Sequence, residues 1–116
     1  MAGGDARQVV LSAARTTNGN SGILPLSDKG ELLHVLFSVT AASGTSPTLT
    51  PSLQWSPDGA ILVPADPADA MTALTTTPGA VKTFNVRASS FQINWTIGGT
   101  TPSFTFAVWV YVTGAP

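Results

Sequence analysis

The stretch SFQINWTIGGTTPSFTFAVWVYVT, residues Ser90–Thr113, decides the fold. Two alternating runs flank a Gly-Gly-Thr-Thr-Pro break at residues 98–102. A period of two over runs this long is typical of strands, because an apolar helical stripe recurs every three or four residues. The residues expected to share the buried faces are Phe91, Ile93, Trp95, Ile97, Phe104, Phe106, Val108, Val110 and Val112. Since the break is rich in turn residues, the stretch predicts a β-hairpin with a loop of several residues.

The rest of the chain carries the same kind of pattern. Further strands are predicted at 8–14, 31–41, 48–56 and 81–87, with a short return strand at 60–63. Turn-forming residues separate them, at 15–21, 27–30, 43–47, 56–59 and 75–79. In the second of these strands Leu33, Val35, Phe37 and Val39 share a face, and apolar residues on its other face favour a central position. Pro51 cannot donate to a ladder, so its strand is expected at an edge or to contain a bulge.

An internal echo links two parts of the chain. GTSPTLTPSLQW at 44–55 resembles GTTPSFTFAVWV at 99–110, an offset of fifty-five residues. Each copy follows a long alternating strand, so the two regions predict strand–loop–strand units of one design. Together with frequent turns, this predicts an all-β fold, an antiparallel β-sandwich of about eight strands with jelly-roll or immunoglobulin-like order. We expect a flexible arm at 1–7 and a single domain at 8–116.

Composition narrows the functional classes. Hydrophobic residues make up 43% of the chain, charged residues only 9%, and the net charge is −1. The few basic residues are scattered, so we expect no nucleic-acid partner and no anionic membrane. The chain has no cysteine, which removes disulfides and thiolate chemistry. So little charge indicates either a surface covered by neighbouring subunits or an extracellular domain kept in solution by Thr and Ser hydroxyls.

Targeting signals are also not evident. The N-terminal residues MAGGDAR lack the basic and apolar regions of a signal peptide, and no apolar run is long enough for a membrane helix. We therefore expect synthesis in the cytoplasm of a host cell.

The residues that could carry chemistry are few and scattered. The single histidine, His34, lies among leucines without an acidic partner on its strand face, which favours a structural or interface role. Asp66 and Asp69 share a loop but lack a recognisable calcium spacing. We expect no enzyme, no catalytic residues, no metal, no cofactor and no small-molecule substrate.

Aromatic residues are better candidates for an interface. Trp109 and Tyr111 lie opposite the valine stripe of their strand, and Trp55 adjoins a turn, whereas Trp95 is expected in the core. Exposed Trp and Tyr either anchor protein partners or stack on sugar rings. The candidate interface residues are Trp109, Tyr111, Trp55, His34, Arg7 and Gln8.

Two segments carry a resemblance to a known class. LQWSPDG at 53–59, and FQINWTIGG at 91–99 leading into SFTF at 103–106, resemble small structural proteins of tailed bacteriophages. The resemblance spans roughly 32–112. It lies in the overall composition and strand pattern and not in a defining motif, since each segment has residues that are common in any turn or strand. It implies a virion component at the capsid surface, a decoration (cement) protein that binds the major capsid protein as a homo-oligomer, either a trimer or a dimer. The alternatives are a tail or head–tail joining protein and a carbohydrate-binding module.

Overall fold

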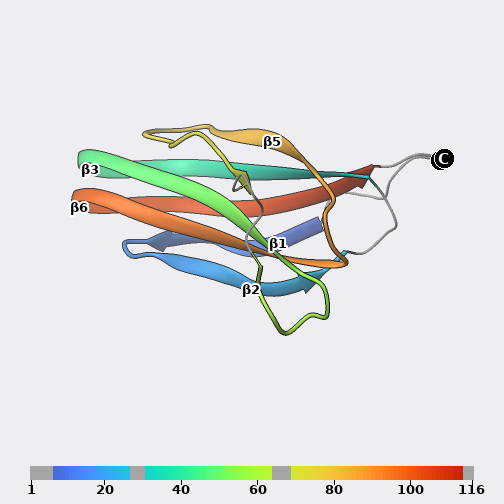
Figure 1. The fold of residues 1–116 in the computed structure, drawn as a ribbon. Coiled ribbons are helices and arrows are strands. Elements are labelled where there is room, and N and C mark those ends of the chain that lie inside the picture. The colour runs from blue at the N-terminus through green and yellow to red at the C-terminus, as the bar shows by residue number, and fades with distance from the viewer. Residues whose placement is uncertain (1–6, 27–30, 64–68, 114–116) are drawn as a thin grey trace.

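All of the regular structure in the described residues is β-strand. The computed structural model describes residues 7–26, 31–63 and 69–113. One antiparallel sheet is formed by six strands (Figure 1): β1 (Arg7–Arg15), β2 (Gly19–Pro25), β3 (Leu32–Ser56), β4 (Asp69–Ala70), β5 (Gly79–Asn85) and β6 (Ser90–Thr113). The predicted all-β antiparallel class is confirmed. The predicted turn at 27–30 lies outside the described residues.

The two longest strands, β3 and β6, pair with each other from end to end. The register runs from Leu32 opposite Thr113 to Ser56 opposite Ser90. The predicted hairpin at 98–102 is therefore wrong, because the two runs of β6 pair with β3 and not with each other. Alternation reveals which residues share a face, but it carries no information on which strand lies alongside. The predicted loop at 43–47 is likewise a bend within β3.

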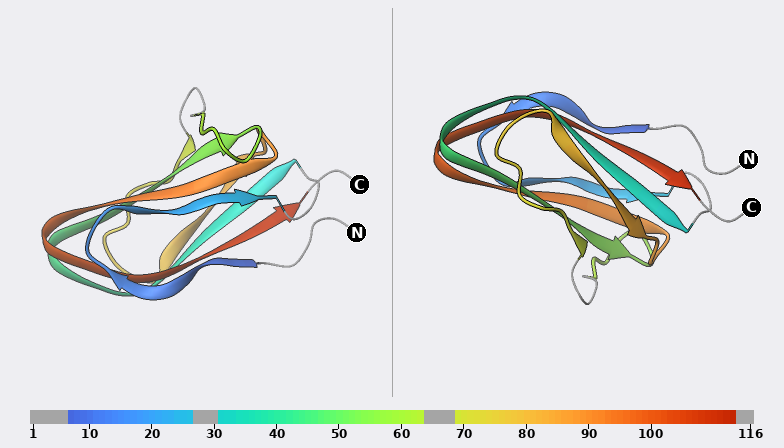
Figure 2. Two further views of the ribbon diagram at one scale, coloured as in Figure 1. Left: turned by 90° about the horizontal axis from the view of Figure 1, so that it is seen from below. Right: turned by 90° about the horizontal axis from the view of Figure 1, so that it is seen from above.

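Both long strands bend sharply at matching positions. Gly44 and Gly99 have the same φ of +112°, while Ser46 and Thr101 have φ of 50° and 46°. These two pairs are the positions that the sequence echo aligns. Figure 2 shows the two bends side by side at one end of the molecule. Glycine is suited to this backbone conformation because it has no Cβ.

Each bend divides its strand between two layers of the folded sheet (Figure 2). One layer, which we call the first layer, contains β1, residues 103–113 of β6, residues 32–43 of β3, and β5. The second layer contains β2, residues 90–98 of β6, residues 48–56 of β3, and β4. Six strands, two of them bent in half, thus give eight paired segments. In each layer the paired segments lie side by side in the order given.

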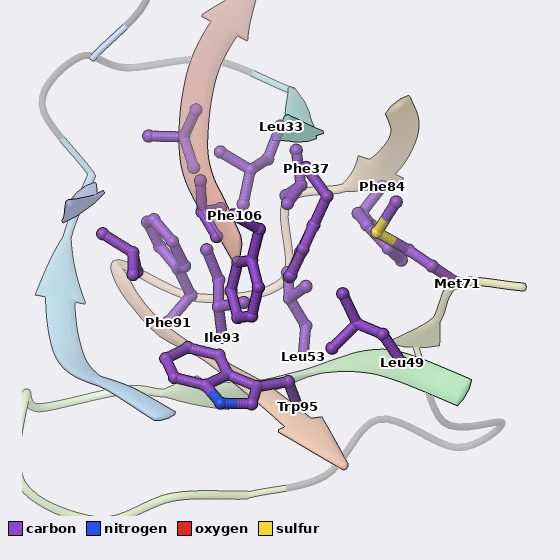
Figure 3. Close-up of a cluster of buried hydrophobic side chains, with 14 of the residues drawn as sticks. Leu33, Phe37, Leu49, Leu53, Met71, Phe84, Phe91, Ile93, Trp95 and Phe106 are labelled. Carbon is purple, nitrogen blue, oxygen red and sulfur yellow. The ribbon is translucent and has the colours of Figure 1, made fainter. Parts of the chain in front are cut away.

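The hydrophobic core lies between the two layers. Both predicted stripes of β6 supply it, and Phe91, Phe104 and Phe106 are fully buried. Trp95 of the second layer meets Phe106 of the first edge to face, with ring centroids 5.2 Å apart. Figure 3 shows the side chains of both layers converging there. Burying an aromatic side chain of this kind stabilises a fold by roughly 1.5–3 kcal/mol, so these residues hold the layers together.

Pro51 lies inside the sheet, so the edge position expected for its strand is wrong. The other alternative, a bulge, agrees with the β4 side, where the register moves by one residue between Leu49 opposite Leu74 and Ser52 opposite Ala70. Pro51 is opposite Trp95 of β6, and its carbonyl accepts a hydrogen bond from the Met71 N–H on the other side, at 3.0 Å. Leu49, two residues earlier, bonds Leu74 on that same side. The missing N–H of Pro51 therefore faces the short β4 side and leaves the ladder with β6 intact. Of the predicted return strand at 60–63, only a bridge between Val63 and Trp55 forms.

Candidate functional site

The outer surface of the first layer carries most of the candidate interface residues. Trp109 of β6 lies opposite Gln8 of β1 on one side and Leu36 of β3 on the other, and Leu36 lies opposite Val81 of β5. Residues directly opposite in an antiparallel pair share a face, so these four form a row across the layer. We call this surface the aromatic face; its members are Gln8, Leu32, His34, Leu36, Val81, Thr83, Trp109, Tyr111 and Thr113.

The aromatic face is uncharged, and it carries two exposed apolar side chains. Trp109 is 37% exposed and Val81 is 59% exposed. At the described positions of this face there is no Lys, Arg, Asp or Glu. Exposed apolar surface of this kind, on a chain with little charge elsewhere, is typical of an interaction site.

His34 occupies the next row of the aromatic face and is held by two hydroxyls. Its Nδ1 lies 2.6 Å from Thr83 Oγ1, and its Nε2 lies 2.8 Å from Thr113 Oγ1. The Tyr111 ring lies beside it, with centroids 5.7 Å apart. A histidine next to a hydroxyl group can act as a base that activates a nucleophile, provided that a carboxylate orients the other ring nitrogen. Here both ring nitrogens of His34 contact threonine hydroxyls, and no carboxylate of the described residues contacts either of them. The arrangement fits a structural role, with the imidazole tying β5, β3 and β6 together.

Trp55 is not a surface aromatic. It is 3% exposed, and its Nε1–H donates to Asp69 Oδ2 at 2.6 Å. The same carboxylate oxygen accepts from Arg87 Nε at 3.0 Å. Trp55 is thus a core residue whose polar end anchors β4, which corrects its placement among the exposed aromatics. The alternating pattern already put Trp55 on the face of Leu49 and Leu53, both of which are buried.

The remaining candidates, Arg7 and Gln8, lie on β1. Gln8 is exposed beside Trp109, which places it at the margin of the aromatic face. Arg7 is opposite Val110, on the side of the layer that faces the core, and its Nη2 donates to the Pro25 carbonyl at 2.9 Å. Arg7 therefore belongs to the strand and links the two layers, whereas residues 1–6 of the predicted arm lie outside the described residues.

The outer surface of the second layer has a different chemistry, which the sequence analysis did not single out. Gln92 Nε2 donates to Asn94 Oδ1 at 2.7 Å, and Asn94 Nδ2 donates to Gln54 Oε1 at 3.1 Å. Hydroxyl residues Ser52, Thr50 and Thr96 continue this surface, which we call the polar face. The signal was present in the alternation, since Gln92, Asn94 and Thr96 occur between the core residues of β6.

Metal and membrane sites find no support in the described part of the chain. Within it, no group of three or more His, Asp or Glu residues is placed to hold a metal ion. Nor does that part contain a helix long and apolar enough to span a membrane. No family model, curated protein or solved structure matches this chain. Its function therefore has to be argued from its surfaces.

Proposed function

We propose that this chain is a non-enzymatic structural protein of a tailed bacteriophage, a capsid decoration protein that binds the major capsid protein through its aromatic face. The observation that carries the proposal is the row formed by Gln8, Trp109, Leu36 and Val81, which spans all four strands of the first layer without a charge. Exposed Trp and Tyr are enriched at the centres of protein interfaces, where they contribute most of the binding energy. The resemblance to phage structural proteins supplies the identity of the partner.

The layered fold supports a mechanical role. The described strands form one continuous sheet that surrounds a single core, so the aromatic face is a rigid surface. Rigid surfaces lose little conformational entropy on binding, which favours a protein that must remain attached to a shell. Many copies on one capsid would cover its surface in the way that a cement protein requires.

The carbohydrate-binding alternative has weaker support. Sugar sites combine an aromatic platform with amide and hydroxyl groups at hydrogen-bonding distance. On the aromatic face, the hydroxyls of Thr83 and Thr113 already contact His34, which leaves the Gln8 amide beside Trp109. The linked carboxamides of Gln54, Gln92 and Asn94 belong to the outer surface of the second layer. The core separates the two surfaces, so one ligand cannot contact both Trp109 and these carboxamides.

Binding to capsids tests the proposal directly. The purified chain is mixed with capsids of the phage that encodes it, and co-sedimentation gives the bound fraction. We expect saturable binding, weakened about tenfold or more by Trp109→Ser, because loss of a central interface aromatic costs about 2 kcal/mol or more. The matched control is Ile61→Ser, which removes a residue that is also apolar and 62% exposed but lies outside the aromatic face.

Three results would each contradict a part of the proposal. Absence of the chain from purified virions, as measured by mass spectrometry, would remove the virion role altogether. Cross-links to tail proteins and none to the major capsid protein would replace the decoration role with that of a tail or head–tail joining protein. Equal weakening by Trp109→Ser and Ile61→Ser would show that the aromatic face is not the binding surface.

A further inference from the structure

Three of the four sheet edges are closed to strand addition. On β1, two register shifts interrupt the pairing with β6 and make the strand irregular. A register shift between Asn20 and Ile23 distorts β2, and β4 has only two residues. Bulges and short length are two of the devices by which proteins keep their edges from pairing with other chains.

The edge of β5 has none of these interruptions (Figure 1). Its seven residues pair with β3 in one continuous register, from Leu32 opposite Asn85 to Ser38 opposite Gly79. Flanking bonds define the pattern, since Val39 N–H donates to the Pro78 carbonyl and Val86 N–H donates to the Glu31 carbonyl. Even-numbered residues of β5 therefore point their backbone groups at β3.

The odd-numbered residues of β5 point their backbone groups away from the sheet. Val81, Thr83 and Asn85 each present an N–H and a carbonyl at this edge, and no described residue is hydrogen-bonded to them. Val81 also projects an apolar side chain from the aromatic face, with 59% of its surface exposed. The edge thus offers unpaired backbone groups beside an apolar side chain, which is the combination that strand addition uses.

We propose that β5 pairs antiparallel with β5 of a second copy of this chain, about a two-fold axis at Val81. In this register the two Val81 residues exchange both backbone hydrogen bonds, so the same groups are satisfied in both copies. The row of Trp109, Leu36 and Val81 then continues into Val81, Leu36 and Trp109 of the second copy. Two aromatic faces become one continuous surface.

Lys82 decides between the possible registers. A two-fold axis at Lys82 would place two lysines directly opposite each other, which is unfavourable. With the axis at Val81, Lys82 lies opposite Ala80 of the second copy. The Lys82 ammonium is held within its own chain, because Nζ donates to the Ala70 carbonyl at 2.7 Å and lies 5.5 Å from the centre of the Phe84 ring. The Lys82 side chain is therefore directed back toward its own chain and leaves the outward N–H and carbonyl groups of β5 accessible.

The dimer deepens the proposed function. It rests on that function for one expectation, that several copies act together on a shell. A dimer presents the aromatic face twice with fixed spacing, so two weak contacts with a symmetric shell act together. The dimer itself forms without a capsid. It can therefore be tested in the purified chain alone.

Cysteine cross-linking tests the edge and its register. The chain contains no cysteine, so a single introduced thiol can react only with its counterpart in another copy. In the proposed register the two Val81 Cα atoms are about 5.5 Å apart, within the range that a disulfide spans. We expect Val81→Cys to form a covalent dimer on mild oxidation. The matched control Thr50→Cys, exposed on the polar face, should remain a single chain.

Sedimentation equilibrium provides the second readout. We expect the wild-type chain to sediment as a dimer and Val81→Lys to weaken dimerisation about tenfold or more, because it opposes two charges. Thr50→Lys adds the same charge to the polar face and should leave the dimer unchanged. Thr83→Pro removes an outward N–H and keeps the backbone ladder with β3, so it should weaken the dimer even if Val81→Lys were to fold poorly. Because it also removes the hydroxyl that contacts His34, Thr83→Val, which loses that hydroxyl and keeps the N–H, is its control.

A wild-type chain that sediments as one copy at every concentration, with Val81→Cys cross-linking no faster than Thr50→Cys, would overturn the inference. If such a monomer still bound capsids, the proposed function would stand without the dimer. A dimer that failed to bind capsids would instead contradict the proposed function alone.

Discussion

At the scale of single residues, Gly44 and Gly99 have strict and matching requirements. A Cβ at Gly44 would lie 2.7 Å from the Thr101 carbonyl oxygen, and one at Gly99 would lie 2.7 Å from that of Ser46. Each bend therefore packs against the backbone of the other. The relation is reciprocal, which explains why both copies of the sequence echo keep glycine at the same position.

Replacing either glycine by alanine should destabilise the fold to a similar extent. We expect Gly44→Ala and Gly99→Ala each to lower the free energy of unfolding by about 3 kcal/mol, because strained backbone and close contact act together. Gly22→Ala is the control, since Gly22 has φ of +75° but nothing within 4 Å of its Cβ position. It should cost about 1 kcal/mol. Urea unfolding measures all three, and equal losses in the three variants would contradict the packing argument.

Asp58 links the stability of one turn to pH. Hydrogen bonds from the backbone N–H groups of Ile61 and Ala60, both at 2.9 Å to Oδ1, lower the pKa of the Asp58 carboxyl below its ordinary value. A lowered pKa in the folded state means that the ionised form stabilises the fold above the ordinary pKa. This stabilisation is lost as the pH falls through the lowered value.

We therefore expect wild type to be more stable than Asp58→Asn at neutral pH. The difference should shrink below about pH 4, where the carboxyl of the unfolded chain becomes protonated. Asparagine retains an oxygen acceptor, so the comparison isolates the charge. Urea unfolding of both proteins between pH 7 and pH 2 measures the difference. A gap that stayed constant over this range would contradict the role of Asp58.

At the scale of elements, β1 depends on one side chain at its end. Arg15 donates to the carbonyls of Leu11, Ala13 and Phe106, and its guanidinium lies 4.6 Å from the centre of the Phe106 ring. Desolvation by partial burial lowers the pKa of Arg15, yet guanidinium groups in proteins stay charged. The planar group holds the irregular part of β1 against β6.

Arg15→Lys should loosen β1 more than the rest of the sheet. Lysine keeps the charge but cannot reach three carbonyls with a planar fork, so we expect a local loss of about 1–2 kcal/mol. Hydrogen exchange of the β1 amides measures this loss, with the β6 amides at Phe91 and Ile93 as an internal reference. Arg87→Lys is the control, since Arg87 forms an ion pair with Asp69 and is not part of β1. Unchanged exchange in β1 would show that pairing with β6 alone holds the strand.

Sequence patterns predicted which side of a strand each residue occupies better than they predicted which strands pair with each other. The residues of β6 expected to face inward are buried or half-buried, because alternation follows from the geometry of a single strand. The break at 98–102 could not be resolved in the same way, since Gly-Thr-Pro chemistry suits a hairpin loop and a bend equally. Which of the two forms depends on β3, more than forty residues away, whose matching bend is apparent only when the strands are seen together.

The candidate site could be predicted to a similar extent. Trp109 and Tyr111 were correctly placed opposite the core because their strand alternates cleanly. The alternation of its strand also places Trp55 toward the core, yet the neighbouring turn suggested exposure. Trp55 is buried by its pairing with β6 and by its hydrogen bond to Asp69, and both involve residues distant in the sequence. The row across four strands needs the register of three strand pairs, which no single stretch of sequence contains.

At the scale of the whole molecule, the two outer surfaces differ in the chemistry of their exposed side chains. The aromatic face exposes Trp109 and Val81, whereas the polar face exposes the hydroxyl residues Thr50 and Thr96. Beside them the linked carboxamides of Gln54 and Asn94 are half-buried and that of Gln92 is buried. An aromatic face covered by other subunits would leave the polar face in contact with water. This arrangement is the one that the proposed assembly requires of a chain that is only 9% charged.

The difference between the two surfaces predicts that folding and assembly depend on different tryptophans. Trp109→Ala should lower the free energy of unfolding by about 1 kcal/mol or less, since a residue that keeps part of its surface in water contributes less to the core. Trp55→Ala should cost about 3–5 kcal/mol, because it opens a cavity and removes one of the two described donors to the Asp69 carboxylate, leaving Arg87. Urea unfolding ranks the two variants, and capsid co-sedimentation ranks them again. The expected order reverses, with Trp109→Ala impairing binding more than any folded Trp55 variant such as Trp55→Phe. If Trp109→Ala lost as much stability as Trp55→Ala, the aromatic face would be part of the core, and its role in assembly would have to be abandoned.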